Sequence, residues 1–206
     1  MGYDDREERG TQGGDGDGDS GQPQQVTTSA LSVLERAQLD VQISTAKAYP
    51  RSIKKFKEEA RAMALLDEET AASCFYAVPR DGKMIEGPSV RLGEIVASSW
   101  GNIKFGTRII GDDGRFITAQ AVCHDLEKNV AISCEVKRRI TNKGGHRYSE
   151  DMIQVTGNAA ASIALRNAVF RVVPFAYVKP IYEECRRAAV GDVKTLGTRR
   201  ANMVAA

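Results

Sequence analysis

The chain has 206 residues, of which 42% are hydrophobic and 27% charged, a composition typical of a soluble globular protein. A chain of this length buries roughly 70% of its unfolded surface, so it needs neither disulfides nor a structural metal to fold. No run of about 18 apolar residues is present, which excludes a membrane-spanning helix, and we expect no secretory signal. Four cysteines without a CxxC pair argue against a zinc finger and favour reduced thiols in the cytoplasm.

Charge is distributed unevenly along the chain. Residues 1–25 hold two arginines and seven acidic residues, whereas residues 136–206 hold 13 basic and five acidic residues. This separation predicts a basic working surface and an acidic tail, and a polyanion is the natural partner of such a surface. The alternative is a C-terminal part whose lysines and arginines are merely solvated.

Three regions are predicted. Residues 1–27 consist largely of Gly, Asp, Gln and Ser without apolar periodicity, so we expect a disordered, acidic, Gly-rich tail. Residues 28–190 are expected to form a single α+β core. Residues 191–206 are interpreted as a C-terminal helix or tail.

The core opens with two predicted helices. The first is expected over residues 30–49, capped by Ser29 and stopped by Pro50, and Ser52 can cap the second. Apolar residues recur at helical spacing along the second helix and predict a buried stripe, namely Ile53, Phe56, Ala60, Met63 and Ala64.

The apolar period then changes to that of β-strands. Residues 74–79 and 84–86 predict a hairpin, and Ser89 is the expected cap of a helix over residues 90–100. A three-stranded antiparallel meander is predicted over residues 103–110, 115–124 and 129–140.

A long helix is expected after the meander, over residues 151–172. Ser149 starts it, Pro174 follows its end, and a last helix is expected to begin near Pro180. The centre of the long helix, residues 157–164, is rich in small residues, which lets another backbone pack closely. The predicted fold class is therefore α+β: a β-hairpin and a three-stranded antiparallel meander packed on a long helix, with flanking helices.

The sequence lacks the motifs of nucleotide-driven enzymes. It contains no G-x-x-x-x-G-K-[ST] and no G-x-G-x-x-G between a strand and a helix, so action on nucleic acid would have to proceed by binding alone. Its two histidines, His124 and His146, have no evident catalytic partner. We therefore expect no enzymatic activity, no cofactor and no bound metal.

One enzyme signature stays as an alternative. Asp112 or Asp113 at a hairpin turn, followed by Glu135 and Lys137 on one strand face, resembles the acid and E-x-K arrangement of metal-dependent nucleases. Two carboxylates would bind Mg²⁺ and the lysine would hold the attacking water. However, E-x-K is a frequent tripeptide, and such pairs also occur as cross-strand partners.

A cationic cluster lies near the end of the meander. Five cations fall within eleven residues around a Gly-Gly pair, with no acid among them: Lys137, Arg138, Arg139, Lys143 and Arg147. Strand alternation places Lys137 and Arg139 on one face and Arg138 on the other. Such a cluster suits a phosphate backbone, whose binding is driven mainly by charge. The alternative is an edge hairpin whose charges prevent strand pairing.

Further DNA-binding candidates lie beyond the cluster. Arg166 and Arg171 follow on the long helix, and Tyr148 and Tyr177 are the best candidates for stacking on bases. The predicted DNA-binding residues are the five cations of the cluster together with Arg166, Arg171 and Tyr148.

The hairpin carries a family resemblance. Residues 75–83 read Phe-Tyr-Ala-Val-Pro-Arg-Asp-Gly-Lys, which is similar to the Y-x-V-P-R stretch of the RecT/Redβ superfamily of phage single-strand annealing proteins. Residues 87–95, Gly-Pro-Ser-Val-Arg-Leu-Gly-Glu-Ile, stand where that family has a short helix. The order of elements over about residues 30–190 also resembles this family.

The resemblance implies an activity. A member of this family oligomerises as a ring or helical filament, holds single-stranded DNA in a basic groove, and anneals complementary strands in homologous recombination without ATP. The resemblance also points to a phage exonuclease as a partner, and to no membrane.

Homo-oligomers are expected from the residues as well. The strand over residues 103–110 presents an edge that charges do not protect, and the small residues of the long helix allow close contact, so neighbouring subunits are predicted to meet there. The alternatives are that the N-terminal helices cover this edge within one chain, or that the protein is a structural or assembly subunit.

Overall fold

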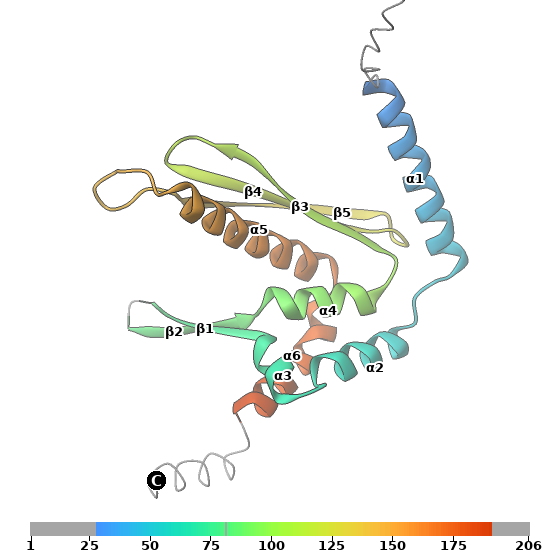
Figure 1. The fold of residues 1–206 in the computed structure, drawn as a ribbon. Coiled ribbons are helices and arrows are strands. Elements are labelled where there is room, and N and C mark those ends of the chain that lie inside the picture. Colours follow the sequence, from blue (N-terminus) through green and yellow to red (C-terminus); the bar gives the residue numbers. More distant parts are fainter. Residues whose placement is uncertain (1–27, 81, 191–206) are drawn as a thin grey trace, which may run out of the picture. The chain divides into compact units, whose positions relative to one another are not determined.

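The fold is α+β, as predicted, and contains two antiparallel sheets (Figure 1). A computed structural model describes residues 28–80 and 82–190. The tail predicted over residues 1–27 and the segment 191–206 lie outside the described residues. Two compact units divide the chain, the first ending at Ala37 and the second beginning at Gln38.

The helices are α1 (Thr28–Ala48), α2 (Ile53–Ala64), α3 (Glu68–Ser73), α4 (Val90–Trp100), α5 (Glu150–Val172) and α6 (Phe175–Val190). The strands are β1 (Phe75–Arg80), β2 (Lys83–Pro88), β3 (Ile103–Asp112), β4 (Phe116–Asp125) and β5 (Val130–Arg139). In the part of the chain that the structure describes, we find no helix with the length and apolar character that crossing a membrane requires.

Serine caps begin three helices where the sequence predicts them. The hydroxyl oxygens of Ser52, Ser89 and Ser149 accept hydrogen bonds of 3.3, 3.3 and 3.4 Å from backbone N–H groups three residues later. Each cap satisfies a donor that the first helical turn leaves without a partner. α1 ends at Ala48, just before Pro50, as predicted.

Three helix predictions are wrong in detail. α1 begins at Thr28, so Ser29 lies inside the helix instead of capping it. α6 begins at Phe175, because the chain resumes a helix directly after Pro174, and Pro180 lies within it. α3 was not predicted; Asp67 caps it by accepting a 2.7 Å hydrogen bond from the backbone N–H of Thr70.

The meander forms a sheet in the order β3–β4–β5, and all its pairing is antiparallel. Directly paired residues share a face, so Ile109, Ala119 and Val136 lie side by side across the sheet. A register shift between Ile109 and Gly111 marks a bulge in β3. β1 and β2 form a separate hairpin, in which β2 extends beyond the predicted residues 84–86.

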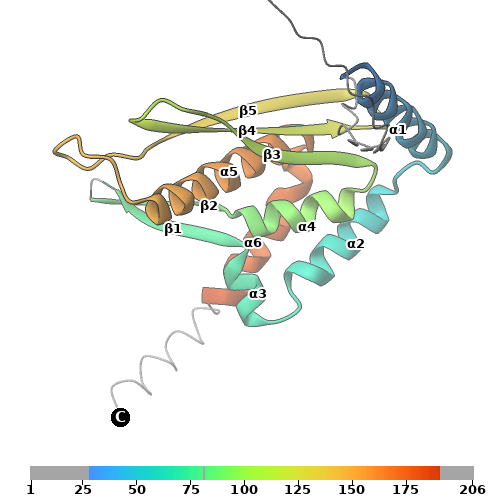
Figure 2. The ribbon, with the colours of Figure 1, turned by 45° about the horizontal axis from the view of Figure 1, so that its top comes forward.

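α5 packs along one face of the three-stranded sheet (Figure 2). Small residues of both elements are fully buried in the resulting core, namely Ala119, Ala121, Ala160 and Ala164. A Cβ atom on Gly157 would stand 3.1 Å from Cδ1 of Ile117. These small residues of α5 therefore pack against the sheet of their own chain, and the contact with a neighbouring subunit stays a prediction.

A layer of helices lies on the other side of α5. α4 packs on α5. α2 packs against both α4 and α6. The ring of Phe56 meets Trp100 edge-on, with 4.9 Å between their centroids. In the predicted α2 stripe, Phe56, Ala60 and Ala64 are buried, but Met63 is 40% exposed because it lies at the edge of that face. All four cysteines are buried and free, and burial raises the pKa of Cys123 to about 12.

Candidate nucleic-acid interface

The predicted cationic cluster lies at the end of the sheet where the β3–β4 turn meets the loop between β5 and α5. We call residues 112–116 and 137–148 the basic sheet end. An isolated bridge pairs Thr141 with Arg147 and closes the loop between them. Within it, the backbone N–H of Asn142 donates to the carbonyl of His146 at 2.9 Å, and the Asn142 side chain accepts from the His146 N–H at 3.0 Å. The loop is therefore held by its own hydrogen bonds.

The faces of β5 are as predicted. Lys137 pairs with Thr118, and Arg139 pairs with Phe116, so both cations lie on the open face of the sheet, away from α5. Arg138 pairs with Ile117, a buried residue on the α5 side. All three cations are exposed, which leaves charge on both faces of the sheet end.

Arg139 is placed by an aromatic ring. Its guanidinium carbon lies 5.6 Å from the centroid of Phe116, the residue directly across on β4. A guanidinium over a ring face is attracted to the ring's negative face. This contact holds a cation on the open face of the sheet without neutralising it.

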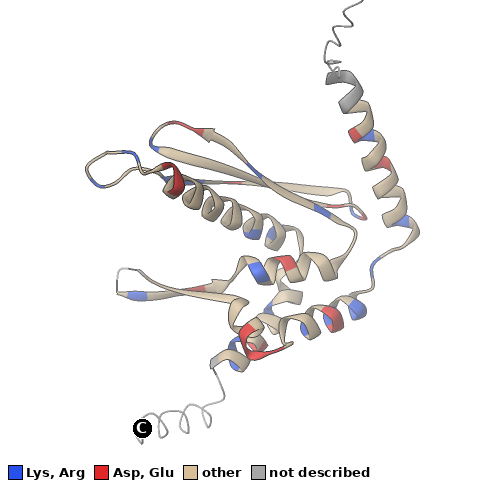
Figure 3. Cartoon of the chain, in the orientation of Figure 1, with Lys and Arg blue, Asp and Glu red and all other residues tan. Residues whose placement is uncertain are grey.

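Acids enter the cluster from the β3–β4 turn, which corrects the expectation of an acid-free site. Arg147 donates two hydrogen bonds to the carboxylate of Asp112, at 2.9 and 2.7 Å. Hydrogen bonding from Arg147 lowers the pKa of Asp112 to about 2. Figure 3 shows acidic positions at this turn and at the start of α5, and cationic positions in the neighbouring loop. Arg147 is therefore already paired, whereas Lys137, Arg138, Arg139 and Lys143 form no ion pair with any other described residue.

The two tyrosines predicted to stack on bases each pack one side against an apolar cluster and are half-buried. Tyr148 contacts a small apolar cluster made of Ile117, Ile140 and Ile153. The ring of Tyr177 lies 5.9 Å from that of Trp100 and is part of the main core. Both rings are half-buried, and their stacking on bases stays a prediction.

The structure separates the α5 arginines from the basic sheet end. Glu150 begins α5 beside the cluster, and Arg166 follows 16 residues later, which is about 24 Å along a helix. The guanidinium carbon of Arg166 lies 5.0 Å from the ring centroid of Tyr76 in β1. Arg171 is exposed near the end of α5. These two arginines therefore belong to another part of the surface.

Sequence reasoning missed two cations on the open face. Lys104 pairs with His124 and Arg108 with Gln120, which places both β3 cations on the face that carries Lys137 and Arg139. Period-2 alternation in β3 could have revealed them once the register was known. The open face thus carries these four cations and one acid, Glu135, whose carboxylate accepts a 3.3 Å hydrogen bond from Gln120.

The residues of the nuclease alternative do not converge. Arg139 pairs with Phe116, the first residue of β4 after the turn that holds Asp113. Glu135 is four residues before Arg139 on β5, so it lies about 13 Å along the strand from that turn. One carboxylate oxygen of Asp113 accepts the backbone N–H groups of Arg115 and Phe116, at 2.9 and 2.6 Å. Among the described residues, no group of three or more His, Cys, Asp or Glu side chains could hold a metal ion.

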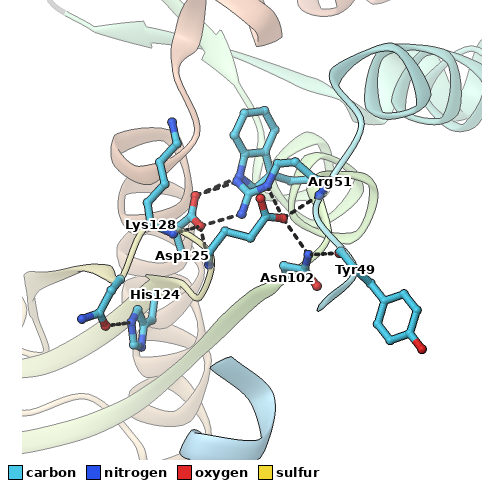
Figure 4. Close-up of polar contacts among 9 residues, drawn as sticks. Tyr49, Arg51, Asn102, His124, Asp125 and Lys128 are labelled. Carbon is cyan, nitrogen blue, oxygen red and sulfur yellow. Dashed lines mark hydrogen bonds and ion pairs between the residues drawn. The ribbon is translucent and has the colours of Figure 1, made fainter. Parts of the chain in front are cut away.

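A buried ion network lies at the opposite end of the sheet (Figure 4). Arg51 donates to both carboxylate oxygens of Asp125, at 2.6 and 2.5 Å, and its side chain and backbone donate to Glu127. The indole N–H of Trp100 also donates to Asp125, at 3.3 Å, and the Arg51 guanidinium lies over the Trp100 ring. This network binds the α1–α2 linker to the β4–β5 turn. Its charged groups pair with one another and stabilise the fold.

Comparisons with protein families, curated proteins and solved structures find no match to this chain.

Proposed function

We propose that the protein binds single-stranded DNA and anneals complementary strands without ATP, acting as a homo-oligomer in phage homologous recombination. The observation that carries this proposal is the set of exposed cations at the basic sheet end. Lys137, Arg138, Arg139 and Lys143 are exposed, lie within seven residues of the chain, and form no ion pair with an acid in the described chain. Unpaired cations on a fixed surface bind phosphates and release the counterions around them.

The chemistry of annealing is compatible with this kind of surface. Contacts to phosphates position a strand but do not occupy the hydrogen-bonding edges of its bases. A second strand can therefore pair with the bound one, and stacking supplies on average about 1.4 kcal/mol per base-pair step. Pairing itself drives the reaction, so no nucleotide hydrolysis is needed. The step from binding to annealing, and a phage exonuclease as partner, rest on the resemblance of residues 75–95 to the RecT/Redβ superfamily.

The test is annealing of complementary oligonucleotides in the absence of any nucleotide cofactor. The variant Arg138→Ala/Arg139→Ala/Lys143→Ala should slow annealing and weaken binding to single-stranded DNA. A plot of the logarithm of the DNA-binding constant against the logarithm of the salt concentration should also be less steep for the variant. Its slope should fall by about 0.7 for each phosphate that the variant no longer neutralises. Unchanged affinity and slope in the folded triple variant would contradict the proposal.

A matched control removes the same number of cations elsewhere. Lys54, Lys55 and Lys179 are exposed on α2 and α6 and form only ion pairs one turn apart. Their triple alanine variant should bind DNA nearly as the wild type does. An equal loss in both variants would show that net charge, and not the basic sheet end, drives binding. Cleavage of the oligonucleotides with Mg²⁺ would favour the nuclease alternative.

A further inference from the structure

The four cations of the open face are arranged along a diagonal of the sheet. Each lies directly across from a residue of the central strand β4, and the pairs are Arg139 with Phe116, Lys137 with Thr118, Arg108 with Gln120, and Lys104 with His124. The first two cations belong to β5 and the last two to β3, and these strands flank β4 about 10 Å apart. The line through the four cations therefore starts at the basic sheet end, crosses β4 and extends about 26 Å along the sheet. We call this line the cation diagonal.

The charges of the cation diagonal are available to a ligand. All four side chains are exposed, and none forms an ion pair with another described residue. Glu135, the one acid that the paired strands place on this face, lies beside Gln120 on β5. At that level the diagonal has already crossed to β3, where Arg108 is the neighbour of Gln120. A polyanion on the diagonal thus meets four cations and passes Glu135 on the far side of β4.

Gly106 leaves a gap between the side chains of Lys104 and Arg108, because residues two apart in a strand share a face. Its φ angle is outside the left-handed region, and a Cβ atom there would meet no atom within 4 Å. The β3 bulge lies farther along, after Ile109. Neither the backbone nor the packing therefore requires glycine at this position, although glycine weakens a strand. A glycine of this kind marks a place where a ligand can approach the strand closely.

We propose that one strand of single-stranded DNA lies on the open face along the cation diagonal and approaches the sheet most closely at Gly106. Single-stranded DNA has a flexible backbone with one phosphate per nucleotide, so its phosphates can reach cations spaced at about 7, 7 and 13 Å along β4. Val122 pairs directly with Gly106 and is 42% exposed, which gives a base an apolar surface there. This inference rests on the proposed function and specifies the path of the bound strand beyond the basic sheet end.

The variant Gly106→Val tests this path without changing any charge. Valine is a good strand former and would pack beside Val122, so the variant should keep or raise the thermal midpoint of the wild type. Its side chain obstructs the close approach, so the affinity for a labelled oligonucleotide, measured by fluorescence anisotropy, should fall several-fold. Ser133→Val is the matched control, because Ser133 is exposed and pairs with Val122 from the β5 side, off the diagonal. The control should bind DNA as the wild type does.

The variant Lys104→Gln/Arg108→Gln tests the charges at the end of the diagonal that is farthest from the basic sheet end. The slope of the logarithm of the binding constant against the logarithm of the salt concentration should fall by about 1.4, which is 0.7 for each of two phosphates. Both positions are exposed, so the thermal midpoint should stay the same. Lys54→Gln/Lys55→Gln removes two exposed cations of α2 and should leave the slope unchanged.

The outcomes separate this path from the proposed function. If the triple variant of the basic sheet end loses affinity while both β3 variants bind as the wild type does, the proposed function stands and the path is overturned. Equal losses in Gly106→Val and Ser133→Val overturn the path too, because the strand would then contact the face on both sides of β4. A loss in Ser133→Val alone would place the strand along β5 and also overturn it. A wild type that binds no single-stranded DNA overturns both proposals.

Discussion

Arg147 illustrates how one contact can change the role of a predicted site residue. In the sequence it is one of five cations, but in the structure it makes a two-pronged hydrogen bond with Asp112. Its role is therefore to fix the loop between β5 and α5, so that Lys143 and Arg139 are presented from a defined backbone. Under the proposed function, the phosphate contacts would be made by the unpaired neighbours.

We predict that Asp112→Asn strengthens DNA binding. The substitution removes an acid from the basic sheet end and weakens its hold on Arg147, so one more cation can reach a phosphate. The slope of the salt dependence should become steeper by about 0.7. Fluorescence anisotropy with a labelled oligonucleotide over a series of salt concentrations measures this, and weaker binding by the variant would contradict it.

The same pair has a defined pH dependence. The pKa of Asp112 is lowered from 3.8 to about 2 by hydrogen bonding from Arg147. A carboxyl whose pKa is lowered on folding contributes stability that is fully present above its unfolded pKa and is lost as the pH falls through the folded value. The contribution of the pair should therefore be constant above about pH 4 and disappear as the pH approaches 2. The difference in stability between wild type and Asp112→Asn, measured against pH, should follow this course.

Arg51 is a residue whose loss should cost much stability. Its side chain and that of Asp125 are only 7% and 3% exposed, so removing one partner leaves a buried charge uncompensated. We expect Arg51→Met to lower the free energy of unfolding by about 3–5 kcal/mol. This corresponds to a fall in Tm of about 6–20 °C for a chain of this size. The control Lys54→Met removes an exposed cation and should leave Tm nearly unchanged.

At the scale of elements, local patterns predicted most of the fold. Ser52, Ser89 and Ser149 cap their helices, and the three strands of the meander form where period-2 alternation indicates them, because caps and alternation act over a few residues. α3 was missed because six residues offer too short a pattern, although Asp67 followed by two glutamates is a typical helix start.

The candidate site was predicted less well than the fold, because its composition depends on contacts distant in sequence. Asp112 meets Arg147 across 35 residues, and Arg51 meets Asp125 across 74 residues. No local pattern reveals either pair. The partial burial of Tyr148 was unforeseen for the same reason, since it depends on Ile117 and Ile153 from other elements.

The packing of α5 on the sheet gives a prediction at this scale. Ala160 is fully buried, so Ala160→Leu inserts three extra carbon atoms into a filled space. We expect it to lower the free energy of unfolding by about 1–3 kcal/mol. Asn158→Leu, at an exposed position of the same helix, is the control and should change stability by less than about 0.5 kcal/mol. Equal stability of both variants by chemical denaturation would show that α5 does not pack as described.

At the scale of the whole molecule, the composition of the N-terminal segment predicts that the core folds without it. Residues 1–25 contain seven acidic residues and two arginines, so their net charge is negative, and they offer almost no apolar surface to bury. A protein that begins at Thr28 should keep the thermal midpoint of the full chain. A fall of more than a few degrees in a calorimetric scan would show that the segment contributes to the folded core.

The network around Arg51 also determines how the molecule would respond to force. Arg51 donates four hydrogen bonds to the core, and Asn102 donates a fifth to the Tyr49 carbonyl. These five bonds act in parallel and hold the segment that follows α1 on the core. A pull along α1 is shared among all five, whereas the helix itself loses its hydrogen bonds a few at a time. We therefore expect the 21 residues of α1 to unwind before this anchorage breaks. Full extension would add about 40 Å to the chain. Under tension α1 would act as an extensible tether, and the core would keep its shape.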